Sequence, residues 1–191
     1  MRRFVFISFS LLFIVALCLV GCKDTQSKGY YERYSKDFNS LDGSQKSFIK
    51  NAYDSLDKDD GEDFVYPILA IAWQESSFGK NVYNHKDPSC GAFQQLLADH
   101  YLKHLKIKDK SLLKKSELCL RLIVDRDFAL SQVRDRLKEW KTRYKDKWWG
   151  QLGYILRSYN GGQNHNQDTA VYERRIKARI KVLENKLDDI L

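Results

Sequence analysis

The chain has 191 residues, of which 43% are hydrophobic and 30% are charged, and its 33 Lys and Arg against 25 Asp and Glu give a formal net charge of +8. This length suits one domain and leaves little room for a second. The excess of positive charge favours anionic partners, and the export signal described next makes anionic lipid and acidic cell-wall polymers the expected ones, not nucleic acid. A lysine-rich face that contacts only solvent would account for the same charge.

The amino terminus has the layout of a secretory signal. Two arginines precede seventeen uncharged residues, 4–20, and the run closes on LVGC, which ends at Cys22. This ending resembles a bacterial lipobox, in which cleavage before the cysteine leaves that residue to carry lipid. A retained membrane helix, which needs about 20 apolar residues, is the alternative. We expect residues 1–21 to be a lipoprotein signal peptide and the exported chain to be anchored through Cys22 to a bacterial envelope membrane, facing the periplasm or cell wall.

Removal of residues 1–21 takes away two arginines and no acids, so the formal charge falls from +8 to +6. Cys18 leaves with the signal, and Cys90 and Cys119 remain as the internal thiols. A pair of exported cysteines can be oxidised. A bridge between them would close a loop of about 30 residues and stabilise the fold by roughly 3 kcal/mol. Two buried free thiols are the other interpretation, and the sequence leaves both open.

Residues 22–43 are polar, with tyrosines but no clear period, and are predicted to form a flexible tether. The folded domain is expected to span residues 44–191. Its first helix is indicated by apolar residues at helical spacing, and the sequence DKDDGED ends the pattern. These apolar residues are Phe48, Ile49, Ala52, Tyr53 and Leu56.

Further helices are predicted along the rest of the chain. One runs from about Asp63 to Ser76, with Pro67 tolerated in its first turn, and another opens at Gly91 and continues to Leu105. One or two helices are expected over 117–145, one over 148–159, and an amphipathic helix over the last 25 residues, whose basic stretch 173–186 is interpreted as a solvated face. No convincing alternating strand pattern is present. The predicted fold class is therefore all-α, a compact helical domain.

Three stretches carry the chemical argument: ESSFG from Glu75, GAFQQL from Gly91, and SYNGG from Ser158. Each alone has an ordinary explanation, as a solvated helix end, a turn, or a helix stop. Together, and in this order, they resemble the lytic transglycosylases of the lysozyme-like superfamily, whose pattern is Glu-Ser, then Gly-Leu-Met-Gln, then Ala-Tyr-Asn-Ala-Gly. The resemblance covers roughly residues 60–176 and implies a lysozyme-like helical fold.

The resemblance assigns roles position by position. Glu75 matches the catalytic acid of the family and Ser76 the serine beside it, while Gly91, Phe93 and Gln94 match the glycine, methionine and glutamine of the second motif. In the third motif the matching residues are Tyr159, Asn160 and Gly162, and Tyr172 matches a downstream tyrosine that often lines the cleft. The departures from the pattern are Ala92, Gln95, Ser158 and Gly161, which affect substrate contacts more than the reaction.

The position of Glu75 suits a proton donor. Apolar surroundings and the negative end of a helix dipole both penalise the ionised carboxylate and raise the pKa of the acid. Trp73 and Phe78 are the candidate apolar neighbours. Tyr159 and Ser76 are predicted to hydrogen-bond the carboxyl group. Two further residues, Asn160 and Gln94, are predicted to meet sugar hydroxyl and N-acetyl groups.

The resemblance implies cleavage of the β-1,4 bond between N-acetylmuramic acid and N-acetylglucosamine in peptidoglycan glycan strands, with an anhydro product and no cofactor or metal. Glu75 alone would act as acid and then base, whereas hydrolysis commonly uses two carboxylates. A hydrolysing muramidase with Asp87 as second carboxylate, and a non-catalytic lipoprotein that binds peptidoglycan, are the alternatives. His100 and His104 have a metal-ligand spacing, but no third ligand is evident, and we expect surface histidines.

Overall fold

A computed structural model of the chain describes residues 28–57, 64–84, 88–98, 102–103, 105–147 and 150–191. The predicted signal peptide, residues 1–21, and the predicted lipid site Cys22 lie outside the described residues. Within the described ranges, none of the helices combines the length and the apolar character that crossing a bilayer requires.

The described part of the chain is mostly helical, which confirms the predicted all-α class. A helix over residues 28–39 comes first. It is followed by α2 (Gly43–Asp57), α3 (Val65–Ser76), α5 (Leu112–Val124), α6 (Arg126–Arg143), α7 (Gln151–Gly161), α8 (Gln167–Lys186) and a short 3-10 helix, η2 (Leu187–Asp189).

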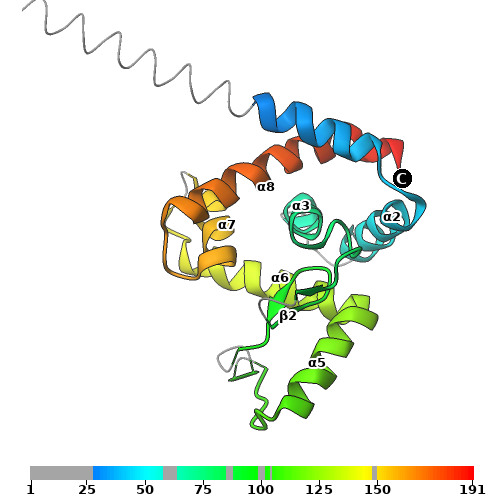
Figure 1. Cartoon of the computed structure of the whole chain (residues 1–191). Coiled ribbons are helices and arrows are strands. Elements are labelled where there is room, and N and C mark those ends of the chain that lie inside the picture. Colours follow the sequence, from blue (N-terminus) through cyan, green and yellow to red (C-terminus); the bar gives the residue numbers. More distant parts are fainter. Residues whose placement is uncertain (1–27, 58–63, 85–87, 99–101, 104, 148–149) are drawn as a thin grey trace, which may run out of the picture.

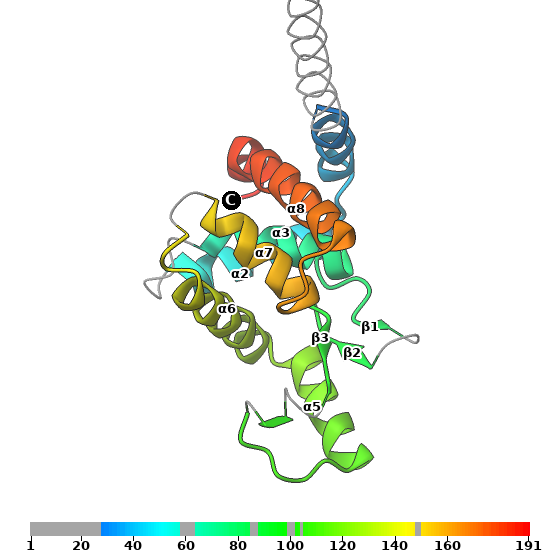
Figure 2. The ribbon, with the colours of Figure 1, turned by 90° about the vertical axis from the view of Figure 1, so that its left-hand side faces the viewer.

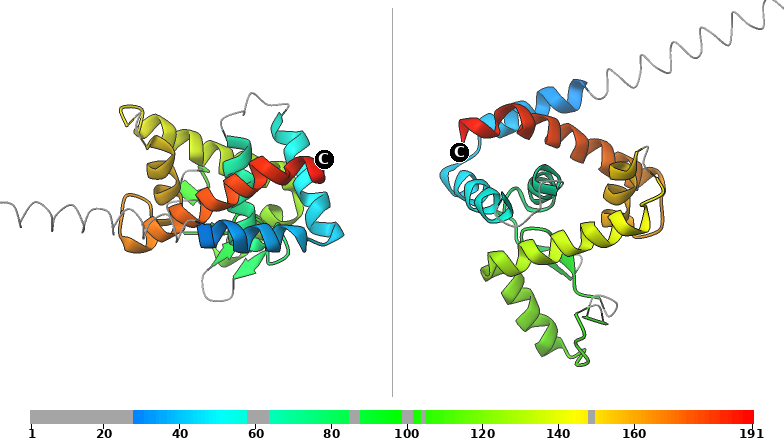
Figure 3. Two further views of the ribbon diagram at one scale, coloured as in Figure 1. Left: turned by 90° about the horizontal axis from the view of Figure 1, so that it is seen from above. Right: turned by 180° about the vertical axis from the view of Figure 1, so that it is seen from behind.

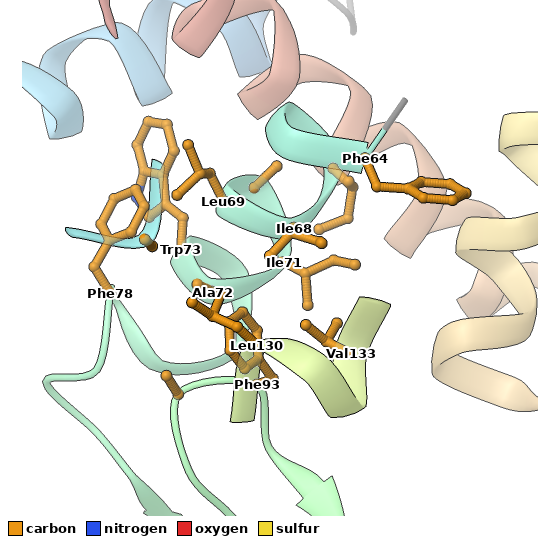
Figure 4. Packing of buried hydrophobic residues seen from close by; sticks show 14 of the residues in the cluster. Phe64, Ile68, Leu69, Ile71, Ala72, Trp73, Phe78, Phe93, Leu130 and Val133 are labelled. Atoms are coloured by element: carbon orange, nitrogen blue, oxygen red, sulfur yellow. The ribbon is translucent and has the colours of Figure 1, made fainter. Parts of the chain in front are cut away.

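Helix α3 lies at the centre of the fold. Figure 1 looks almost along it and shows α8, α2, α6 and α7 arranged around it. Its sequence, VYPILAIAWQES, is apolar on nearly every side, as expected of a helix that is enclosed by others, and the run from Pro67 to Trp73 is buried. In Figure 4, Phe93 and the α6 residues Leu130 and Val133 pack against the face of α3 that carries Ala72. The rigid core therefore holds the carboxyl end of α3 in place.

The prediction of a flexible tether is wrong for residues 28–41. These residues form a helix and a turn that run beside α8 (Figures 1 and 3). Tyr34, Phe38 and Leu41 are only 3%, 4% and 8% exposed. They recur at the i, i+4, i+7 spacing of a buried helix face, which the polar residues between them concealed.

A small antiparallel sheet lies between α3 and α5, with strand order β1 (Tyr83–Asn84), β2 (Ser89–Cys90) and β3 (Gln95–Leu96). It lies near α5 in Figure 2. The predicted helix from Gly91 is wrong over residues 91–96, which form a turn and then β3. Strands of two residues are too short to show an alternating pattern in the sequence. Positive φ angles at Gly91 and Gln94 are incompatible with the predicted helix. Gly91 has φ 79°, and a Cβ atom there would lie 2.6 Å from the carbonyl oxygen of Leu122.

A disulfide joins Cys90 of β2 to Cys119 of α5, with 5.3 Å between the Cα atoms. The structure thus selects the bridged alternative of the two that the sequence left open. The bridge attaches the sheet to α5, which turns Leu118 and Leu122 inward. The predicted helical region 117–145 is divided into α5 and α6 at Asp125, whose carboxylate accepts a hydrogen bond from the Phe128 N–H at 3.0 Å and so caps α6.

We expect Phe38→Ala to lower the free energy of unfolding by about 3 kcal/mol, because it removes a buried aromatic ring from the core. Lys36→Ala, on the exposed face of the same helix, is the matched control. Urea denaturation of both variants measures the difference. Equal stabilities would show that residues 28–41 do not pack against the domain in solution.

Candidate active site

Glu75 lies in the last turn of α3, which ends at Ser76 as predicted from the sequence. Three successive residues then adopt left-handed backbone conformations: Ser77 (φ 54°), Phe78 (φ 58°) and Gly79 (φ 81°). The N–H groups of Ser77 and Phe78 donate to the carbonyls of Trp73 and Ala72, both at 3.1 Å, and so satisfy the end of the helix. The chain therefore changes direction directly after α3, and Glu75 lies at this turn.

Ser76 connects the end of α3 to Ala92 in the second motif by a hydrogen bond. Its hydroxyl lies 2.7 Å from the carbonyl oxygen of Ala92 and 3.0 Å from that of Ala72, and it accepts the Gly79 N–H at 2.7 Å. The residue is 1% exposed. The predicted hydrogen bond from Ser76 to the Glu75 carboxyl group is therefore wrong, because these backbone groups engage the hydroxyl. These hydrogen bonds restrain the loop after α3, and the loop in turn restrains the last turn of the helix, which carries Glu75.

The direct partner of the carboxyl group is Tyr172. Its hydroxyl donates to Oε1 of Glu75 at 2.7 Å, across the contact between α8 and α3. Burial, followed by the neighbouring Glu75 charge, raises the pKa of Tyr172 well above its ordinary value of 10. The phenol thus stays protonated and remains a donor. Tyr172, which the resemblance placed in the cleft, therefore holds the carboxyl group, while the Tyr159 hydroxyl donates to the Phe93 carbonyl.

The pKa of Glu75 is raised above its ordinary value of 4.5, and burial is the largest cause. The hydrogen bond from Tyr172 and the positive charge of Arg179 act in the opposite direction without cancelling this effect. Trp73 and Phe78, the predicted apolar neighbours, are buried, and their rings stack with centroids 5.4 Å apart at this end of α3. Figure 4 shows the two rings together. The raised pKa means that burial disfavours the ionised carboxylate of Glu75, which is the direction that a proton donor needs.

Arg179 was not predicted as part of the site. Its guanidinium lies 3.7 Å from the ring centroid of Tyr34 and 5.4 Å from that of Trp73. Burial lowers the pKa of Arg179 below its usual value. The stretch 173–186 was interpreted as solvated, but Arg179 follows Tyr172 by seven residues and so shares its buried face. That spacing is a signal which could have found it.

A pocket of about 250 Å³ opens beside Glu75. It brings together three of the predicted substrate-contacting residues, Gln94, Tyr159 and Asn160. Ser76 and Tyr172 do not line the pocket; Ser76 binds the carbonyl of Ala92, and Tyr172 binds the Glu75 carboxyl group. Its other described lining residues, which the sequence analysis did not single out as contacts, are Asn84, Ser89, Gln95, Leu96 and Arg136.

Residues of the second and third motifs are fixed around this pocket by hydrogen bonds. Gln94 has a positive φ of 46°, and its amide nitrogen donates to the carbonyls of Asn81 and Gly91 at 3.0 and 3.1 Å. The Tyr159 hydroxyl donates to the Phe93 carbonyl at 2.9 Å. Asn160 lines the pocket and is exposed. Glu75 thus lies beside a polar pocket in which the Gln94 and Tyr159 side chains are held by hydrogen bonds.

Three of the four departures from the transglycosylase pattern that the sequence resembles have a physical explanation in this chain. Gln95 is buried and donates from Nε2 to the Tyr159 hydroxyl at 3.1 Å. Ser158 lies 2.8 Å from both the Tyr144 hydroxyl and Nε2 of His165. At Gly161 a Cβ atom would lie 2.5 Å from the Thr169 methyl group, so the threonine occupies the space that an alanine would need. The carbonyl of Ala92, the fourth departure, accepts the Ser76 hydroxyl described above.

Asp87, His100 and His104 lie outside the described residues. Among the residues that the structure describes, no group of three or more His, Cys, Asp or Glu side chains is arranged to hold a metal ion.

Comparison of the chain with protein-family models found no match. Searches of curated proteins and of solved structures also found no match. The candidate site therefore depends on its own geometry and chemistry.

Glu75→Gln is expected to stabilise the fold at neutral pH and to have little effect near pH 4. As the pH rises through 4.5, the unfolded chain releases this proton while the folded chain retains it, so the wild-type acid lowers stability with rising pH. Glu173→Gln is a control of opposite sign. Burial of Glu173 raises its pKa, but Lys177 and Arg157 outweigh that effect and hold the pKa below its usual value.

Urea denaturation of wild type, Glu75→Gln and Glu173→Gln between pH 4 and pH 8 measures both effects. Glu173→Gln should be less stable than wild type at neutral pH, because the glutamine loses two ion pairs. A Glu75→Gln variant that is destabilised at pH 7 would contradict the raised pKa of the acid in the folded chain.

Proposed function

We propose that the protein is a peptidoglycan lytic transglycosylase. It cleaves the β-1,4 bond between N-acetylmuramic acid and N-acetylglucosamine and leaves an anhydromuramyl end. The observation that carries this proposal is Glu75, a carboxyl group with a raised pKa that is held by Tyr172 at the edge of a polar pocket. The order of the three motifs, which resembles that of the lytic transglycosylases, supports the same conclusion.

In the proposed reaction Glu75 begins protonated and donates its proton to the glycosidic oxygen as the bond breaks. The resulting carboxylate accepts the proton of the muramyl 6-hydroxyl as that oxygen bonds to the anomeric carbon. One residue thus acts as acid and then as base, and no water is consumed. Tyr172 keeps its proton throughout and holds Oε1 in position, and its hydrogen bond stabilises the carboxylate between the two steps.

The other groups in the pocket suit an N-acetylated sugar. Among its described lining residues are four carboxamides, and a carboxamide can both donate to and accept from the hydroxyl and N-acetyl groups of a glycan. Their side chains come from three separate segments of the chain that meet at the pocket. These residues are Asn84, Gln94, Gln95 and Asn160.

We also propose that the chain is exported and lipidated at Cys22. The disulfide between Cys90 and Cys119 supports export, because such bonds persist in oxidising compartments. Five residues separate Cys22 from Lys28, the first residue that the structure describes. Even fully extended, they span roughly 20 Å, so a lipid at Cys22 would keep the domain close to the membrane surface.

Glu75→Gln should abolish the release of anhydromuropeptides from isolated sacculi, because a carboxamide is too weak an acid to protonate the glycosidic oxygen. Glu184→Gln, an exposed change on α8, is the matched control and should keep full activity. Mass spectrometry of the soluble products measures the outcome. Full activity of Glu75→Gln would refute the assignment of the acid, and new reducing ends in place of anhydro ends from the wild type would identify a hydrolase.

A further inference from the structure

Arg136 is the cationic side chain among the described residues that line the Glu75 pocket. It projects from α6, whereas Glu75 lies on α3 and the remaining lining residues come from the sheet region and α7. Its guanidinium carbon lies 5.5 Å from the centroid of the Tyr159 ring. The arginine therefore belongs to the same recess as the acid and next to the third motif.

The pocket has one cationic and one acidic side chain among its described lining residues, Arg136 and Glu75. Of the described lining residues, Glu75 is the only acid, and burial favours its neutral form. The other polar groups are amides and hydroxyls, which suffice to bind a neutral sugar. A guanidinium adds a full positive charge and a planar set of N–H donors that matches a carboxylate in two parallel hydrogen bonds. This charge suggests that the ligand carries an anion.

Stacking on Tyr159 does not use the hydrogen-bonding capacity of Arg136. The guanidinium carbon lies 5.5 Å from the ring centroid, near the outer limit of about 6 Å for cation–π contacts. Such a contact engages none of the five N–H donors of a guanidinium, so these donors can bind a ligand in the pocket.

We propose that Arg136 binds a carboxylate of the substrate and so determines specificity for muramyl glycan over neutral N-acetylglucosamine polymers. This inference rests on the proposed function, since it assigns a substrate group to the same pocket. Two carboxylates have the required chemistry: the lactyl carboxylate of a muramyl residue that carries no peptide, and the carboxylates of an attached stem peptide. Arg136 acts in binding and takes no part in the proton transfers of Glu75.

The test measures the binding of glycan fragments to the full exported chain with the Glu75→Gln change, so that no turnover occurs. Three probes of equal length are compared by calorimetry: fragments with stem peptides, the same fragments after enzymatic removal of the peptides, and an N-acetylglucosamine oligomer. Adding Arg136→Gln should weaken binding of the carboxylated fragments about tenfold, the scale of a charge-assisted hydrogen bond. Binding of the neutral oligomer should not change.

Arg126→Gln, an exposed change on the same helix outside the pocket, is the matched control and should bind all three probes like its parent. Arg136→Lys should recover part of the lost affinity, because it keeps the charge but not the paired geometry. A loss confined to the peptide-bearing probe identifies the stem peptide, and a loss on the stripped probe identifies the lactyl group. Equal losses on all three probes, or no loss on any, would overturn the proposal.

The two proposals fail in different ways. If the wild-type chain releases no anhydro ends but binds charged glycan more tightly than neutral glycan, and Arg136→Gln removes this preference, the lyase activity is refuted and the role of Arg136 stands. If the wild type is active but Arg136→Gln reduces kcat/KM equally on charged and neutral glycan, the arginine only supports Tyr159 and the specificity role is refuted.

Discussion

The site depends on one hydrogen bond between two helices, from the Tyr172 hydroxyl on α8 to Oε1 of Glu75 on α3. Ionisation of an acid at the end of a buried helix costs free energy, and free rotation of its side chain would leave the carboxyl group without a defined position. Tyr172 limits both problems, since it fixes one oxygen and partly offsets the burial that raises the pKa. The packing of α8 along α3 is thus a requirement of the chemistry as well as of the core.

The loop after α3 imposes the second constraint. Ser76 joins the end of the helix to the carbonyl of Ala92, and Gly91 allows the backbone to approach Leu122 closely. The disulfide between Cys90 and Cys119 fixes the same segment from the other side. These contacts place Gln94 and Gln95 on the pocket wall without using either residue to hold the acid. The residues that position the acid and the residues that line the pocket wall are therefore different side chains.

Much of this arrangement follows from local sequence pattern. The apolar run before Glu75 predicts an enclosed helix, and the glycine after it predicts the stop. The partner of the acid is harder to predict, because Tyr172 is 97 residues away and its contact depends on how α8 crosses α3. The buried face of residues 28–41 was missed because polar residues separate Tyr34, Phe38 and Leu41. Arg136 lies outside all three motifs, so only the folded chain brings it to the pocket.

The central claim is that the Glu75 carboxyl group is biased toward its protonated form. Its most direct test is a ¹³C NMR titration of the Glu75 side-chain carboxyl in the intact protein. The account predicts a Glu75 pKa above 4.5, the ordinary value of a glutamate side chain. A Glu75 pKa at or below 4.5 would mean that burial does not favour the protonated acid, and the proposed first step would lose its proton donor.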